Sequence, residues 1–145
     1  MVPTLSGRIQ TRVFLLLVIG IPWTLIVTPL LPHPSGVGVG TVYKTTFWIL
    51  GEVLIVGALI WEPVYHGLMQ FRWEKDWPVM FSLLQAVPEG AVAVLLVHAI
   101  GPAAKPSAAA FLIDFVPLWV LVWLAALGPM RVVSHRWRFR GGQLL

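Results

Sequence analysis

Cysteine is absent from this chain of 145 residues, and charged residues make up only 11% of it. The missing cysteine excludes disulfide bonds, thiolate metal sites, thiol redox catalysis and lipidation on cysteine. Soluble domains average about 25% charged and about 45–50% apolar residues. This sequence is instead 58% hydrophobic, with a mean hydropathy of +0.85. These values predict an integral membrane protein without a separate catalytic domain in water.

The positive charge does not indicate a nucleic acid partner, although the sequence pI is near 10.1. The basic residues lie at the ends of apolar blocks, where membrane topology and anionic headgroups account for them. No RNA-binding or DNA-binding module fits such blocks. We therefore expect no nucleic acid partner, and anionic lipids are the expected partners of the basic residues.

Four apolar blocks predict helices over about residues 12–32, 45–66, 78–100 and 109–130. Each is near the ~20 residues needed to cross about 30 Å of hydrocarbon, and backbone groups in lipid must be satisfied within the segment. The first block is too long for a signal-peptide core and lacks a small-x-small cleavage site, so we interpret it as a retained helix. The prediction is an all-α integral membrane four-helix bundle, with residues 1–145 forming a single transmembrane domain.

Internal prolines and charged flanks refine this prediction. Pro22, Pro88 and Pro117 lie inside the blocks and predict kinks. With four spans, eight of the basic residues fall on the side of both termini and two on the other. Because cytoplasmic flanks carry the excess of lysine and arginine, both termini are predicted to lie in the cytoplasm, with the bundle in the plasma membrane.

The six acidic residues fall into two groups. One group lies at or near the cytoplasmic flank, where a solvated or snorkelling role is expected: Glu62, Glu74 and Asp76. The other group lies inside three different spans and supplies the candidate intramembrane polar contacts: Glu52, Glu89 and Asp114. At about 1.5 Å per residue the depths from the outer ends are about 10 Å, 17 Å and 8 Å, so all three could share one layer.

An unpaired charge at mid-span costs about 2.5–3.5 kcal/mol on insertion scales. No lysine or arginine lies at comparable depth in the predicted spans, so the sequence predicts that no internal salt bridge forms. Three alternatives remain. Glu89 could be protonated and donate a hydrogen bond to a carbonyl freed by Pro88, the acids could take up a proton or cation in transit, or they could pair with polar groups of a neighbouring subunit.

The tail, residues 131–145, alternates basic and aromatic residues just after the last span. Such a segment can anchor topology, hold anionic lipid at about 1 kcal/mol per basic residue, or dock on a partner. The candidate residues for these roles are Arg131, Arg136, Trp137, Arg138, Phe139 and Arg140.

Histidines and glycines do not define a cofactor site. His33 and His98 are expected on the outer side and His66 and His135 on the inner side, but a bis-histidine haem site needs side chains that face one another from ordered helices. The "GVGVG" stretch at 36–40 lacks the preceding strand and the spacing of a dinucleotide-binding loop. We expect no cofactor and no metal.

The segments "GRIQTRVFLLLVIGIPW" and "SHRWRFRGGQLL" resemble the two ends of small actinobacterial four-helix membrane proteins. One group of these is the lipid uptake coordinator subunits that accompany mycobacterial MCE lipid importers. The resemblance covers the two ends and the hydropathy profile, and it carries no functional residues across. It implies an accessory chain beside the permease helices of a multi-subunit transporter.

Three functions follow from these observations. The first is a non-catalytic accessory subunit of a larger membrane complex, associated with a lipid transporter of the MCE type. The alternative is a small proton-coupled transporter that uses its intramembrane carboxylates. A membrane enzyme is disfavoured, because the inward acids lack a His-x-x-x-His motif or a pair of glutamates, and a catalytic arginine-rich pattern inside the membrane is missing.

Overall fold

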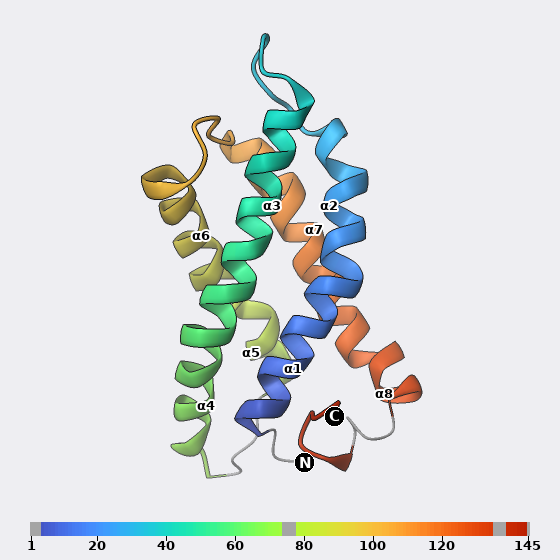
Figure 1. Ribbon diagram of the computed structural model, residues 1–145. Helices are drawn as coiled ribbons and strands as arrows, with labels where there is room; N and C mark the ends of the chain where they lie inside the picture. The colour runs from blue at the N-terminus through green and yellow to red at the C-terminus, as the bar shows by residue number, and fades with distance from the viewer. Residues whose placement is uncertain (1–3, 74–77, 135–138, 145) are drawn as a thin grey trace.

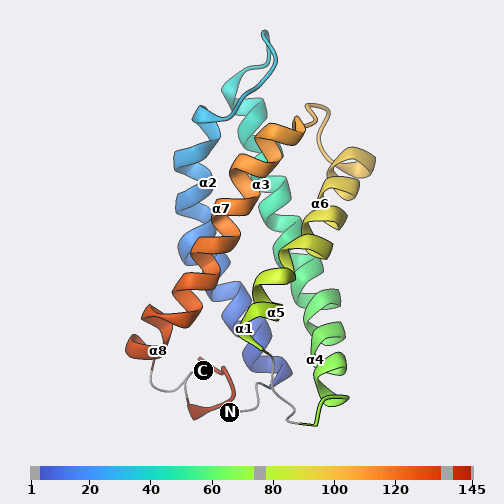
Figure 2. The same cartoon turned by 180° about the vertical axis from the view of Figure 1, so that it is seen from behind.

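The computed structural model describes residues 4–73, 78–134 and 139–144, and its helices are arranged as one elongated bundle (Figure 1). Four helices in this part of the chain are long and apolar enough to cross a membrane: Leu5–Leu30, Val39–Gln70, Val79–Ile100 and Ala108–Val133. The prediction of an all-helical chain with four such helices is confirmed. Both chain ends lie at one end of the bundle, called the terminal end here, and the connections 31–38 and 101–107 lie at the other, the loop end (Figures 1 and 2).

Each long helix is made of shorter elements that follow one another with at most one residue between them. The first contains α1 (Leu5–Leu15), the π-helical segment η1 (Leu16–Gly20), α2 (Ile21–Val27) and the 3-10 turn η2 (Thr28–Leu30). The second contains α3 (Val39–Val56), the π-helical segment η3 (Gly57–Trp61) and α4 (Glu62–Gln70). The third contains α5 (Val79–Leu84) and α6 (Ala86–Ile100), and the fourth contains α7 (Ala108–Leu127) and α8 (Pro129–Val133).

The first helix begins at Leu5, well before the predicted start at residue 12. Thr4 is its N-cap, and the threonine hydroxyl accepts a hydrogen bond from the Gly7 amide at 3.0 Å. This satisfies one of the amides that the first turn leaves without a helical partner. The consequence is that Arg8 and Arg12 stand on the helix itself, four residues apart and on one face, rather than in a flank.

Three prolines lie just beyond the irregular parts of the long helices. Pro22 follows η1 and Pro63 follows η3, while Pro88 comes shortly after the break between α5 and α6. Proline has no amide hydrogen for the carbonyl four residues before it, so the helix must relax there. The predicted interruptions at Pro22 and Pro88 thus take the form of a π-helical segment and a helix break, whereas Pro117 lies within α7.

The core lies between α3, α6 and α7, with the middle of the first helix packed against it. Its buried members are Leu16, Ile49, Leu50, Val53, Ala93, Val97, Phe111, Phe115 and Leu118. Gly90 allows α6 to approach α7 closely, because a Cβ there would lie 2.9 Å from a ring carbon of Phe115. Small residues at such contacts are typical of helix packing in lipid.

A leucine at Gly90 should therefore destabilise the bundle, by about 1–3 kcal/mol as overpacking does in other cores. Gly51, inside α3, supplies the matched control, because a Cβ at that position meets nothing within 4 Å. Thermal unfolding in detergent should show a lower midpoint for Gly90→Leu and none of this loss for Gly51→Leu. Equal midpoints would contradict the close approach of α6 and α7.

Candidate functional site

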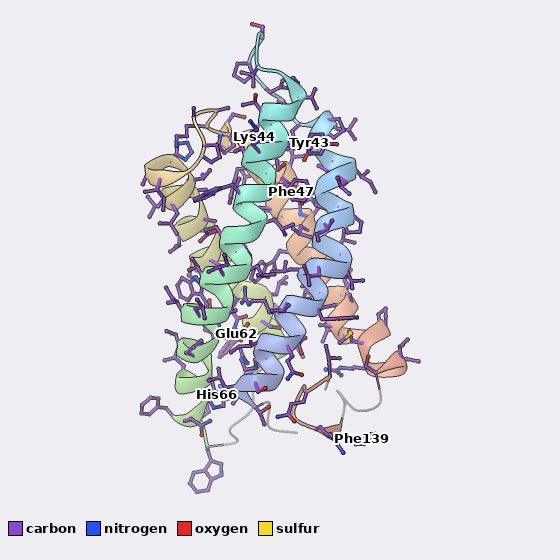
Figure 3. The ribbon with its side chains drawn as sticks, in the orientation of Figure 1. Tyr43, Lys44, Phe47, Glu62, His66 and Phe139 are labelled. Atoms are coloured by element: carbon purple, nitrogen blue, oxygen red, sulfur yellow. The ribbon has the colours of Figure 1, made fainter. Side chains whose placement is uncertain are left out.

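Two arginines of α1 and two glutamates from other helices form a charge cluster in the half of the bundle nearest the terminal end. The Arg12 guanidinium donates two hydrogen bonds to Glu89 of α6, with Nη1–Oε2 at 2.6 Å and Nη2–Oε1 at 2.8 Å. Its Nε donates to Oε1 of Glu62 at 2.8 Å, and Arg8 Nε donates to Oε2 of the same carboxylate at 2.7 Å. Figure 3 labels Glu62 where α4 lies close to α1. We call these four residues the charge cluster.

The charge cluster is buried and electrically balanced. The side chains of Arg12 and Glu89 are 9% and 2% exposed, and those of Arg8 and Glu62 are 10% and 8% exposed. Two positive and two negative groups cancel when all four are ionised. Fork-shaped bidentate contacts are the strong form of the arginine–carboxylate pair, and they suit arginine better than lysine. The geometry therefore favours a fixed structural junction over a group that exchanges protons.

The neighbours of Arg12 are shaped to admit its guanidinium. Gly57, the first residue of η3, lies directly against the guanidinium, so any Cβ at that position would collide with it. On another side Arg12 lies 5.9 Å from the ring centre of Trp119, within the range of a cation–π contact. Nη1 also donates to the Val53 carbonyl at 3.4 Å. The π-helical segment and a glycine thus leave room for a charged side chain inside the bundle.

The prediction that no internal salt bridge forms is wrong for Glu89. It counted Arg12 as part of the flank, whereas the helix begins at Leu5 and carries Arg12 about two turns inward. The long side chain then extends further along the bundle to the carboxylate. Glu89 instead pairs with an arginine of its own chain, which none of the three alternatives included.

The prediction that Glu62 has a solvated or snorkelling role is also wrong, because Glu62 is only 6% exposed and lies between the two arginines. Glu74 and Asp76 lie outside the described residues. Sequence reasoning missed Arg8, Arg12 and Glu62 as site residues. The spacing of the two arginines by four positions within "GRIQTR" was the available signal, since it places both on one helical face.

Glu52 and Asp114 do not join the charge cluster by any hydrogen bond among the described residues. Glu52, on α3, is half-buried, and its Oε2 is buried without a hydrogen-bond partner there. Asp114, on α7, is 6% exposed, and its Oδ1 is also buried without a hydrogen-bond partner among the described residues. Its backbone carbonyl accepts a hydrogen bond from Trp23 Nε1 at 3.0 Å, which ties α7 to α2. The expectation that these acids lie in the interior is met for Asp114 and in part for Glu52.

Asp114 lies in the walls of two cavities. The larger, of about 290 Å³, extends from Asp114 and Thr24 to Arg8 and Arg131 near the terminal end. The smaller, of about 40 Å³, lies at the loop end among the connections 31–38 and 101–107. Asp114 and Ile49 line both. A buried acid between cavities that lead toward opposite ends is an arrangement that the sequence did not reveal.

The last residues of the chain pack against the start of α1. The Gly141 carbonyl accepts hydrogen bonds from the Thr4 amide at 2.9 Å and from its hydroxyl at 3.2 Å. The Leu144 amide donates to Gln10 Oε1 at 2.8 Å. Gly7 lies directly against the backbone of Gly141, so a Cβ at Gly7 would displace the tail. The two ends of the chain therefore form one joined structure.

The candidate residues of the tail differ in what the structure says of them. Arg131, Phe139 and Arg140 are exposed at the terminal end, where Figure 3 labels Phe139. Arg136, Trp137 and Arg138 lie outside the described residues. In the described part of the chain, no group of three histidine, aspartate or glutamate side chains lies close enough to hold a metal ion.

Comparisons with known proteins leave the interpretation to this geometry. No family model matches the chain, and searches of curated proteins and of solved structures give no significant match.

Removal of Arg12 should destabilise the fold more than removal of Arg8. Arg12→Leu leaves the buried carboxylate of Glu89 without an arginine and Glu62 with Arg8 alone, and loss of one member of a buried ion pair costs about 3–5 kcal/mol. Arg8→Leu leaves Glu62 paired with Arg12 and should cost less. Circular dichroism during thermal unfolding in detergent measures the order, with exposed Lys44→Leu as the control. If Arg12→Leu unfolds at the same temperature as Lys44→Leu, the charge cluster does not hold the helices together.

Proposed function

We propose that this chain is a multi-pass plasma-membrane protein with both termini in the cytoplasm, and that it works as a non-catalytic accessory subunit of a larger membrane complex. Four apolar helices of sufficient length support the membrane location. The described basic residues support the orientation, because Arg8, Arg72, Arg131 and Arg140 lie toward the terminal end. At the loop end, Lys105 Nζ donates to the Val97 and Gly101 carbonyls at 2.8 and 2.9 Å and so caps the end of α6.

The observation that carries the proposal is the joined structure of the two chain ends. The segments that resemble actinobacterial accessory proteins are far apart in sequence, yet they pack together at the terminal end. Exposed aromatic and basic side chains surround this end of the bundle. Trp73 is 99% exposed, Phe71 90% and Phe139 71%, and Arg140 is also exposed. Aromatic residues and arginine are enriched in protein interfaces and dominate their binding energy.

The docking surface therefore lies at the terminal end and not in the span interior. Glu89 is occupied by Arg12, so it does not need a partner chain. The terminal end, by contrast, presents large side chains that are mostly exposed. By the resemblance, the partners are the permease helices of an MCE-type lipid importer, and anionic headgroups contact the arginines around them.

Replacement of Phe139 and Arg140 should release the subunit from its complex. We expect F139A/R140E to lose at least about tenfold in copurified partner chains after native purification in mild detergent, because an interface anchor contributes about 1.4 kcal/mol or more. The matched control, V39A/K44E, makes the same kinds of change at the loop end and should retain the partners.

Two results would argue against docking through the terminal end. One is full copurification with F139A/R140E. The other is equal loss with V39A/K44E, which would indicate general destabilisation. Gly7→Leu adds an independent check, because it displaces the tail from α1 without changing any exposed tail residue, and it too should reduce copurification.

The two cavities that share Asp114 in their walls favour a second candidate, a small proton-coupled transporter. A buried carboxyl between cavities that lead toward opposite ends can receive a proton from one side and release it to the other. Purified chain reconstituted in vesicles should then dissipate a pH gradient, measured with an enclosed pH-sensitive dye. Asp114→Asn should abolish this flux, and Glu52→Gln, which changes an acid that lines neither cavity, should retain it. Absence of flux in the unaltered chain would exclude this function for the chain alone.

A further inference from the structure

The larger cavity is an elongated space inside the terminal half of the bundle. Its walls come mainly from α1, α5 and α7, with α2 and α3 closing its deep end. From Asp114 to Trp123, two wall residues on α7, the axial distance is about 14 Å at ~1.5 Å per residue. Most side chains along this stretch are apolar, among them Leu15, Leu118 and Val122. A volume of about 290 Å³ is near the lower end for small-molecule sites, which begin at about 300 Å³.

Three polar atoms in the wall of this cavity have no hydrogen-bond partner in the part of the chain that is described. They are Thr24 Oγ1, Gln85 Nε2 and Asp114 Oδ1. Their residues are 1%, 8% and 6% exposed, so lipid headgroups and bulk water do not cover them. A buried polar group without a partner is unfavourable, and folded proteins rarely retain one. Three such atoms in the wall of one cavity are available to hydrogen-bond a molecule inside it.

Thr24 and Asp114 mark the deep end of the cavity. Trp23, the residue before Thr24, donates its indole N–H to the Asp114 carbonyl, which places the two polar side chains at the same level of the bundle. Nearer the terminal end, the Trp119 indole donates to the Ser82 carbonyl at 3.3 Å and the Trp123 indole to the Val79 carbonyl at 3.2 Å. These two tryptophans join α7 to α5 and line the apolar stretch.

The charges around the cavity determine which kind of polar head group a bound molecule can have. The charged residues in its wall are Arg8, Arg12, Glu62, Asp114 and Arg131. Arg8 and Arg12 are paired within the charge cluster, and Arg131 is exposed at the far end. At the deep end the only charged group in the wall of the described cavity is the acid Asp114. An anionic head would be repelled there, whereas a hydroxyl or amine head can donate a hydrogen bond to Oδ1.

We propose that this cavity binds a single-chain amphiphile whose hydrogen-bond-donating head, a hydroxyl or an amine, contacts Asp114 and Thr24 while its alkyl chain runs beside Trp119 and Trp123. The site is independent of the accessory-subunit function, since it lies within one chain. It gives the chain a specific small ligand of its own. The apolar walls supply binding energy and the deep polar groups supply selectivity for the head.

Tryptophan fluorescence of the purified full chain in detergent tests the proposal. The probe is 12-bromo-1-dodecanol, whose terminal bromine quenches indoles that it touches and would lie near Trp123 when the hydroxyl lies at Asp114. We expect saturable quenching, with affinity about tenfold or more above that of 1-bromododecane, which lacks the head. We also expect 12-bromododecanoic acid, ionised at pH 8, to bind at least about tenfold more weakly than the alcohol. The amine analogue should bind at least as well as the alcohol.

Variants separate the head contact from the chain contact. Thr24→Val and Asp114→Leu should each lower the affinity for the alcohol by about tenfold and leave the bromoalkane unchanged, because each removes one polar contact. The double variant W119F/W123F should remove the saturable part of the quenching. Val122→Trp places a large side chain in the cavity and should block binding. Val120→Trp, on the exposed face of the same helix, should not. Thermal unfolding of each variant identifies any that fail to fold.

Several results would overturn the proposal. Equal binding of the alcohol and the bromoalkane would show that Asp114 and Thr24 do not recognise the head group. Quenching that rises linearly without saturation would show partition into detergent only. Saturable quenching that survives in the double variant W119F/W123F would place the ligand elsewhere, and tight binding of the carboxylate would refute the charge argument.

Discussion

The buried guanidinium of Arg12 is the constraint on which the arrangement of the helices depends. It contacts carboxylates from the second and third long helices, and Arg8 completes the balance of charge. An ion pair inside a low-dielectric bundle is tolerable only when its geometry is good and its charges cancel. Since both carboxylates must meet one planar group, the heights and rotations of three helices are fixed relative to one another. Any slip of one helix along another would leave a buried charge without its partner.

The irregular parts of the helices serve the same requirement. A π-helical segment before Pro63 places Gly57 against the Arg12 guanidinium. The break before Pro88 is followed by α6, which has Glu89 in its first turn. Proline by itself would leave carbonyl groups without amide partners inside the bundle. Indole N–H groups of Trp119 and Trp123 donate to carbonyls of α5, the short helix that precedes this break. The interior is thus held by polar contacts at the places where the regular helix stops.

Polar groups inside this bundle are of two kinds. Those of the charge cluster are hydrogen-bonded within the chain. Their role is to hold the helices in place, not to take part in a reaction. Those in the wall of the larger cavity, on Thr24, Gln85 and Asp114, are buried without partners among the described residues. Intramembrane polar groups that the fold does not satisfy are where binding or transport is expected. The contrast separates the structural part of the interior from the part that is available to a ligand.

The sequence by itself determined the number of long helices and their approximate bounds, because hydropathy and length are properties of the linear chain. It could not determine the partner of Glu89, which stands 77 residues from Arg12, or the burial of Glu62. Those depend on the rotation of each helix about its axis and on the height at which helices cross, and packing alone decides both. The same holds for the tail, whose glycines meet α1 only because the chain ends come together in the folded bundle.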